Sequence, residues 1–173
     1  VLSLILSLGG AGLNAVTGLP QLGGTLISII YTVMVIVCVF TINRFGAATI
    51  MFGILGILAI PFPITGTPGL FIKVPILIIG GLISDILFSV LKKREWTASL
   101  LIGGVLLFYL AIVLIAVARV FSIPGMELQA NTSLSPVVII APFIVGGIGG
   151  AIGKFLYSRI SSTGIVKRIQ MSE

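Results

Sequence analysis

Apolar residues fill this chain in long runs that are separated by short polar or Gly/Pro-rich segments. Six runs stand out, at residues 1–18, 22–42, 47–61, 70–91, 97–121 and 136–157, and a polar tail follows at residues 158–173. A helix needs about 20 mostly apolar residues to cross a hydrocarbon core of roughly 30 Å. The pattern predicts an all-α integral membrane protein, with six transmembrane helices in one bundle and one domain over residues 1–173. After the short third run, we expect a plain turn rather than a partly embedded loop.

The composition agrees with this pattern. Hydrophobic residues make up 58% of the 173 residues and charged residues only 8%, far below the roughly 25% of soluble domains. The net charge of +6 would raise the question of nucleic acid in a soluble protein. Here the basic residues lie mostly between apolar runs and form no stripe with interleaved aromatics, so we exclude nucleic-acid binding. We expect a multi-pass protein of the cell (cytoplasmic) membrane, surrounded by the lipid bilayer.

The basic residues between the runs predict the orientation. Arg44 follows the second run, Lys92–Arg94 follow the fourth, and Arg159, Lys167 and Arg168 lie in the tail. The alternate connections, at residues 19–21, 62–69 and 122–135, contain no Lys or Arg. Because cytoplasmic loops carry the excess of basic residues, both termini are predicted to be cytoplasmic.

The residues available for catalysis are few. The chain has no histidine, one cysteine (Cys38) and four acidic residues, so the commonest general base and metal ligand are absent. We predict no catalytic site, no metal site and no cofactor, and therefore no enzyme. The chain also lacks a Gly-rich nucleotide-binding loop with a Lys, so ATP hydrolysis would need other subunits. Asp85 lies deep in a span, and we expect it to pair with Lys154 or another base at the inner edge.

Two basic residues, Lys73 and Arg119, lie near the outer ends of their spans rather than in cytoplasmic connections. They either extend to the lipid headgroups or face an outward cavity. Other polar side chains fall at the same outer level. If these groups converge, they suit a pocket for a small polar organic molecule. The predicted substrate-binding residues are Lys73 and Arg119, with Glu127, Asn131, Asn14 and Gln21 as weaker candidates.

Small residues recur at four-residue spacing, which lets helix backbones approach closely in lipid. In the sixth run, Gly146/Gly150 and Gly149/Gly153 occupy several faces. That arrangement favours internal packing at a crowded bundle centre. In the first run, Ala11 and Ala15 lie on a predicted terminal helix, where one face would be free for a partner.

These features together resemble the substrate-binding S components of energy-coupling factor (ECF) transporters: about 170 residues, six spans with both ends inside, the Ala11/Ala15 pair, Pro20 after the first run, and polar outer connections. The resemblance covers nearly the whole chain and is one of architecture, with Ala11/Ala15 as its one motif. It implies capture of a vitamin or micronutrient from outside. It also implies a transmembrane coupling subunit that docks at Ala11/Ala15, and two cytoplasmic ATPases.

Two other interpretations remain open. The chain is alternatively a small oligomeric channel or secondary transporter, in which Asp85 and the Gly-rich sixth run line the path of the transported solute. Against this interpretation, the two halves show no convincing repeat. It is otherwise a structural subunit of a larger membrane complex, in which Lys73 and Arg119 anchor lipid or a partner.

Overall fold

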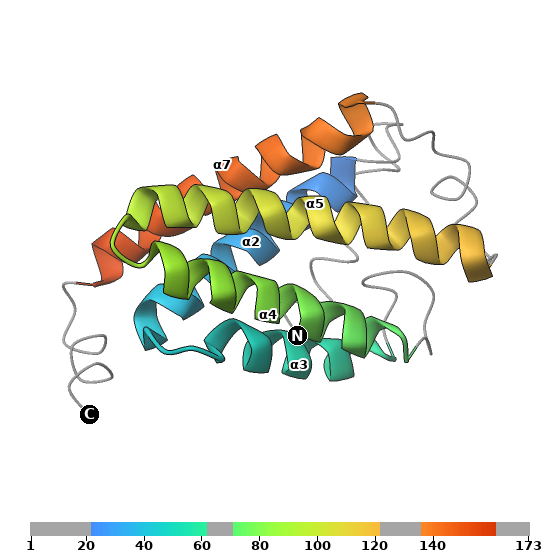
Figure 1. Cartoon of the computed structure of the whole chain (residues 1–173), viewed down its shortest axis with the longest axis horizontal. Coiled ribbons are helices and arrows are strands. Elements are labelled where there is room, and N and C mark those ends of the chain that lie inside the picture. The colour runs from blue at the N-terminus through green and yellow to red at the C-terminus, as the bar shows by residue number, and fades with distance from the viewer. Residues whose placement is uncertain (1–21, 62–70, 122–135, 162–173) are drawn as a thin grey trace.

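The computed structural model of the chain describes residues 22–61, 71–121 and 136–161. These residues form helices and no strand (Figure 1). The described helices are α2 (Leu22–Ile42), α3 (Ala47–Ala59), α4 (Lys73–Leu91), α5 (Glu95–Phe121) and α7 (Pro136–Ile160). The all-helical prediction is thus confirmed for them, with bounds close to those expected. The first apolar run and the predicted turn after the third run lie outside the described residues, so the count of six spans, the turn and the position of the termini stay predictions.

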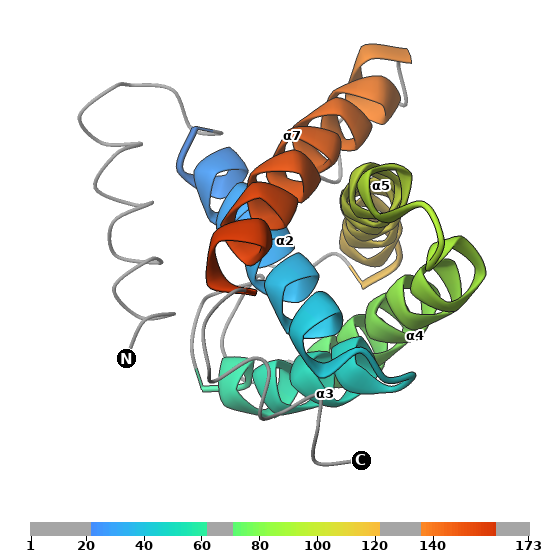
Figure 2. The same cartoon turned by 90° about the vertical axis from the view of Figure 1, so that its left-hand side faces the viewer.

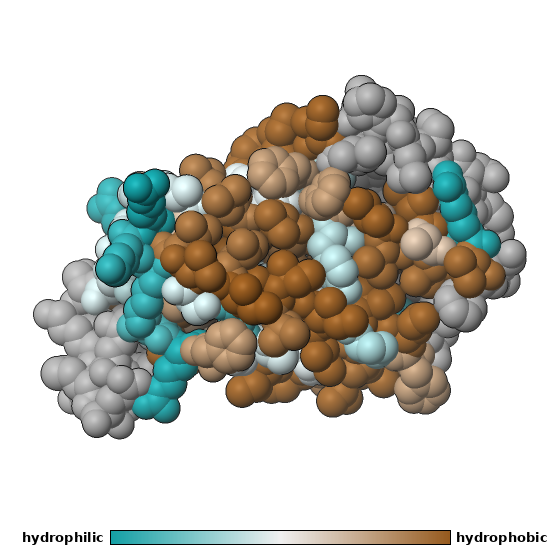
Figure 3. Space-filling model, in the orientation of Figure 1, coloured by the Kyte–Doolittle hydropathy of each residue, from teal (hydrophilic) through white to brown (hydrophobic). Residues whose placement is uncertain are grey.

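Three of these helices are long and apolar enough to cross a membrane, namely Lys73–Leu91, Glu95–Val117 and Ile140–Ile160. Ser28–Ile42 and α3 are shorter apolar helices. Large hydrophobic side chains also cover much of the outer surface (Figure 3). Because an apolar exterior of this kind suits lipid rather than water, the chain is an integral membrane protein.

The helices lie side by side and pack mainly in two pairs (Figures 1 and 2). In one pair α3 packs against α4, and in the other α5 packs against α7. α2 packs against α7 and also contacts α3 and α5, while α4 contacts α5. α2 and the α4–α5 contact therefore join the two pairs into one bundle.

The buried core is built from large side chains of α2, α3, α4 and α5, and α7 contributes differently. From Ile140 to Ile160, the part of α7 whose burial is described, the buried residues are four glycines and Lys154. The fully buried large side chains come from the other helices and include Ile36, Phe52, Ile102 and Leu106. α7 is thus held by close backbone contacts rather than by inserted side chains.

Two glycines of α7 meet the backbone of α5. A methyl group added at Gly146 would lie 2.1 Å from the carbonyl oxygen of Gly103. One added at Gly150 would lie 2.1 Å from that of Ser99. No side chain fits at such distances, so this face of α7 requires glycine.

The other two buried glycines of α7 meet α2. A methyl group at Gly149 would lie 3.0 Å from Cβ of Thr32, and one at Gly153 would lie 2.8 Å from Cβ of Ile36. The prediction of internal packing on several faces of this helix is therefore confirmed.

Exposed basic side chains gather at one end of the bundle, which we call the basic end. The α2–α3 connection, the α4–α5 connection and the C-terminus of α7 all lie there (Figure 1), and hydrophilic side chains collect at that end in Figure 3. Its exposed basic residues are Arg44, Lys92, Lys93, Arg94 and Arg159. At the opposite end lie the first residue of α4, Lys73, and the last turn of α5 with Arg119. The described helices therefore sort their charges as the sequence predicts.

Candidate functional site

A buried carboxylate, that of Asp85, lies in the second half of α4. It is fully buried. Its oxygens accept hydrogen bonds from the backbone N–H of Ala48 (3.0 Å), the backbone N–H of Thr49 (2.9 Å) and the hydroxyl of Thr49 (2.6 Å). Asp85 therefore caps the N-terminus of α3 from a neighbouring helix. An anion there also lies at the positive end of the helix dipole.

The local sequence explains why the cap comes from another helix. The N-cap residue of α3 is Gly46, which has a left-handed backbone (φ 96°) and no side chain to accept the first N–H groups. Gly81, one turn before Asp85, allows the approach, because a methyl group there would lie 2.7 Å from Cα of Thr49. Gly81 therefore lets α4 lie close enough to α3 for the Asp85 carboxylate to reach the start of α3.

The opposite end of α3 meets the second buried charge of α4. Lys73, only 3% exposed, donates a hydrogen bond from its ammonium group to the carbonyl oxygen of Ala59 (3.2 Å). Ala59 is the last residue of α3, where carbonyl groups lack partners within the helix. A cation there suits the negative end of the helix dipole. The anion and the cation of α4 thus bind the two ends of α3.

Spacing along the two helices explains how one helix holds both ends of the other. Lys73 and Asp85 are twelve residues apart, which is about 18 Å along α4. Ala48 and Ala59 are eleven residues apart, or about 17 Å along α3. Because α3 and α4 run in opposite directions, the two charges coincide with the two ends of α3 (Figure 1).

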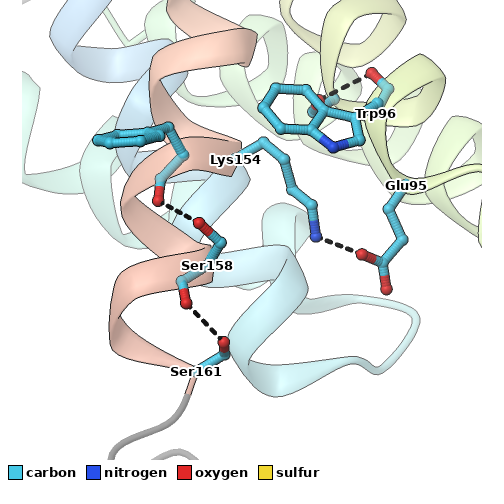
Figure 4. Close-up of polar contacts among 7 residues, drawn as sticks. Glu95, Trp96, Lys154, Ser158 and Ser161 are labelled. Atoms are coloured by element: carbon cyan, nitrogen blue, oxygen red, sulfur yellow. Dashed lines mark hydrogen bonds and ion pairs between the residues drawn. The ribbon is translucent and has the colours of Figure 1, made fainter.

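Lys154 of α7 lies at the basic end and points towards Glu95, the first residue of α5 (Figure 4). Its ammonium group forms an ion pair with the Glu95 carboxylate. It also lies 4.7 Å from the ring centroids of both Phe40 and Tyr157. The predicted pairing of Asp85 with Lys154 or another base is therefore wrong: Asp85 binds two backbone N–H groups and the Thr49 hydroxyl of α3, and Lys154 binds Glu95.

Sequence reasoning missed both of these partnerships for identifiable reasons. Glu95 was not weighed as a partner of Lys154, although both fall at the same predicted membrane edge. The cap at Ala48 and Thr49 depends on the position of α4 beside α3, which no local pattern shows. The available signal was Gly46, since a helix that starts without a capping side chain needs an acceptor from elsewhere.

Of the predicted substrate-binding residues, Lys73 and Arg119 fall within the described helices. Both lie at the end opposite the basic end, on the neighbouring helices α4 and α5, with Lys73 buried and Arg119 exposed. The other predicted positions lie outside the described residues: Asn14, Gln21, Glu127, Asn131 and the docking pair Ala11 and Ala15. Their convergence with Lys73 and Arg119 stays a prediction.

Within the described ranges, no group of three or more His, Cys, Asp or Glu side chains lies close enough together to hold a metal ion. No family model, no curated protein and no solved structure matches this chain. A functional proposal therefore rests on the residues themselves.

Proposed function

We propose that the chain is the substrate-binding subunit of an ECF-type uptake transporter, which captures a small polar vitamin or micronutrient from outside the cell. The observation that carries the proposal is Lys73, a cation that is 3% exposed at the end opposite the basic end. Charged side chains within membrane helices usually face a bundle interior or a watery cavity and mark substrate pathways. The five exposed basic residues at the other end favour the cytoplasm for that end.

On this proposal, the ligand enters from the end that holds Lys73 and Arg119. Lys73 has a fixed position because its ammonium group is bonded to Ala59, and a fixed cation suits an anionic or polar group of the ligand. A transmembrane coupling subunit at Ala11/Ala15 and cytoplasmic ATPases would supply the energy. A channel lined by Asp85 is less favoured, because three hydrogen bonds from α3 occupy that buried carboxylate.

The test begins with purification of the chain and identification of co-purified small molecules by mass spectrometry. Arg119→Gln should then weaken binding of the identified compound about 10- to 150-fold, as expected for loss of a charged hydrogen bond. Lys73→Met should also weaken it, and its unfolding free energy must be measured in parallel because Lys73 also binds α3. Lys93→Gln, at the basic end, is the matched control and should bind normally.

Two results would contradict the proposal. Normal affinity in folded Arg119 and Lys73 variants would show that the ligand pocket lies elsewhere. Solute flux through the purified chain in liposomes, with no ATPase present, would favour the channel or secondary transporter instead.

A further inference from the structure

An open apolar groove with a volume of about 920 Å³ lies between α2 and α3 and reaches the C-terminal end of α7. Val33 and Val37 of α2, Ile50 and Ile54 of α3 and Leu156 of α7 form part of its wall. Ile50 and Ile54 are 67% and 55% exposed, so their side chains are not covered by the described helices. An apolar hollow of this size is at the upper end of the range of ligand sites.

The length of the groove matches one leaflet of a bilayer. Along α2 it extends from Val33 to Ile42 at the basic end, which is about 14 Å for a helix. Half of a hydrocarbon core is roughly 15 Å. The polar side chains in its lining are Cys38, Thr41 and Arg44, so a polar solute would find few partners along most of its length. A lipid acyl chain fits this shape and chemistry better.

The positive charge at the end of the groove indicates which kind of lipid headgroup would bind there. Arg44 lines the groove in the connection between α2 and α3, at the end that also carries Lys92, Lys93, Arg94 and Arg159. A guanidinium group binds phosphate through two parallel hydrogen bonds. Basic pockets between membrane helices attract anionic headgroups for this reason.

We propose that this groove binds an anionic phospholipid from the leaflet at the basic end, with an acyl chain between α2 and α3 and its phosphate at Arg44. The lipid would fill the space beside Ile50 and Ile54. The site does not depend on the proposed transport function, because its charged end at Arg44 lies at the end of the bundle opposite Lys73 and Arg119.

The first test measures headgroup selectivity. The full chain, purified and freed of lipid in detergent, is titrated with dioleoyl phosphatidylglycerol or dioleoyl phosphatidylcholine, and bound lipid is counted by native mass spectrometry. Phosphatidylglycerol should bind at least about fivefold more tightly, and Arg44→Gln should remove that preference. Lys93→Gln, exposed at the same end but outside the groove lining, should keep most of it. Equal losses in both variants would indicate general surface attraction and overturn the site.

The second test places the lipid in the groove. Cys38 lines the groove and is the one cysteine of the chain, so its alkylation by N-ethylmaleimide reports whether the space is filled. Phosphatidylglycerol should slow alkylation at about fivefold lower concentration than phosphatidylcholine, and Arg44→Gln should abolish this difference. Equal protection by both lipids would overturn the proposal.

Discussion

The α3–α4 pair and the α5–α7 pair are held together inside the membrane by different kinds of contact. In the first pair, two buried charges of α4 bind the backbone at the ends of α3. In the second pair, glycines bring the backbones together, so that even one methyl group would meet a carbonyl oxygen at 2.1 Å. The first pair depends on charge at defined points, and the second depends on shape along a face.

The difference follows from helix length. α3 has 13 residues and is therefore about 20 Å long, less than a hydrocarbon core of roughly 30 Å. At least one of its ends cannot reach the polar surface, and an unpaired backbone group in the apolar layer costs several kcal/mol. α5 and α7 have 27 and 25 residues, so their ends can reach water or headgroups. They can use their whole length for packing and need no buried charge to satisfy their termini.

The largest expected effect comes from breaking the cap of α3. Asp85→Ala leaves the N–H groups of Ala48 and Thr49 without their acceptor, and each unsatisfied buried group costs about 1–3 kcal/mol. The unfolding free energy should therefore fall by about 2–6 kcal/mol, measured by SDS titration in mixed micelles with circular dichroism. Asp85→Asn, which keeps one carbonyl oxygen, should lose less.

A serine on the same helix provides the control for this measurement. Ser89 is exposed and donates its hydroxyl to the carbonyl oxygen of Ile86 within α4, so Ser89→Ala should change stability by less than about 0.5 kcal/mol. Equal stability of the Asp85→Ala and Ser89→Ala variants would mean that the cap does not hold α3 against α4.

An intermediate effect is expected where α7 meets α5. Gly146→Ala introduces a methyl group 2.1 Å from the carbonyl oxygen of Gly103, and that backbone atom cannot rotate away. The helices must separate, at a cost of about 1–3 kcal/mol in the same unfolding assay.

Gly147, the next residue on α7, provides a matched control. A methyl group there would lie 3.8 Å from the carbonyl oxygen of Leu100, an ordinary contact distance. Gly147→Ala should be neutral or stabilise the helix by up to about 1 kcal/mol. If both alanine variants behave alike, close backbone approach is not what holds this pair together.

The sequence predicted the packing of the α5–α7 pair better than that of the α3–α4 pair, and the reason is physical. Four-residue glycine spacing is a local pattern that identifies a packing face without knowledge of the partner, so Gly146 and Gly150 were found. The partners of Asp85 are two backbone N–H groups and the hydroxyl of Thr49, at positions 36 and 37 residues away. Backbone groups have no sequence signature, so the sequence predicts a charged partner instead, Lys154 or another base at the inner edge.

The prediction of Lys73 and Arg119 as substrate-binding residues is limited in the same way, because the sequence reveals a charged residue but not its backbone partner. Lys73 and Arg119 were found because a charge within an apolar run is visible in the sequence, and both lie at one end of the bundle as expected. That Lys73 also binds the end of α3 depends on how α4 packs against α3, which brings Ala59 next to it. Neither the hydrophobic pattern nor the spacing of residues along the chain predicts the contact between Lys73 and Ala59.

The smallest expected effect tests whether the α5–α7 pair also depends on charge. Lys154 and Glu95 form an ion pair across it, but the Glu95 side chain is 56% exposed, so solvent screens the interaction. Phe40 and Tyr157 still face the ammonium group in Glu95→Gln, and the variant should lose less than about 1 kcal/mol of unfolding free energy. Salt screens exposed charges, so raising the ionic strength should reduce the difference in unfolding free energy between wild type and variant. A loss above about 2 kcal/mol that salt does not reduce would show that this pair, like α3–α4, depends on a charged contact.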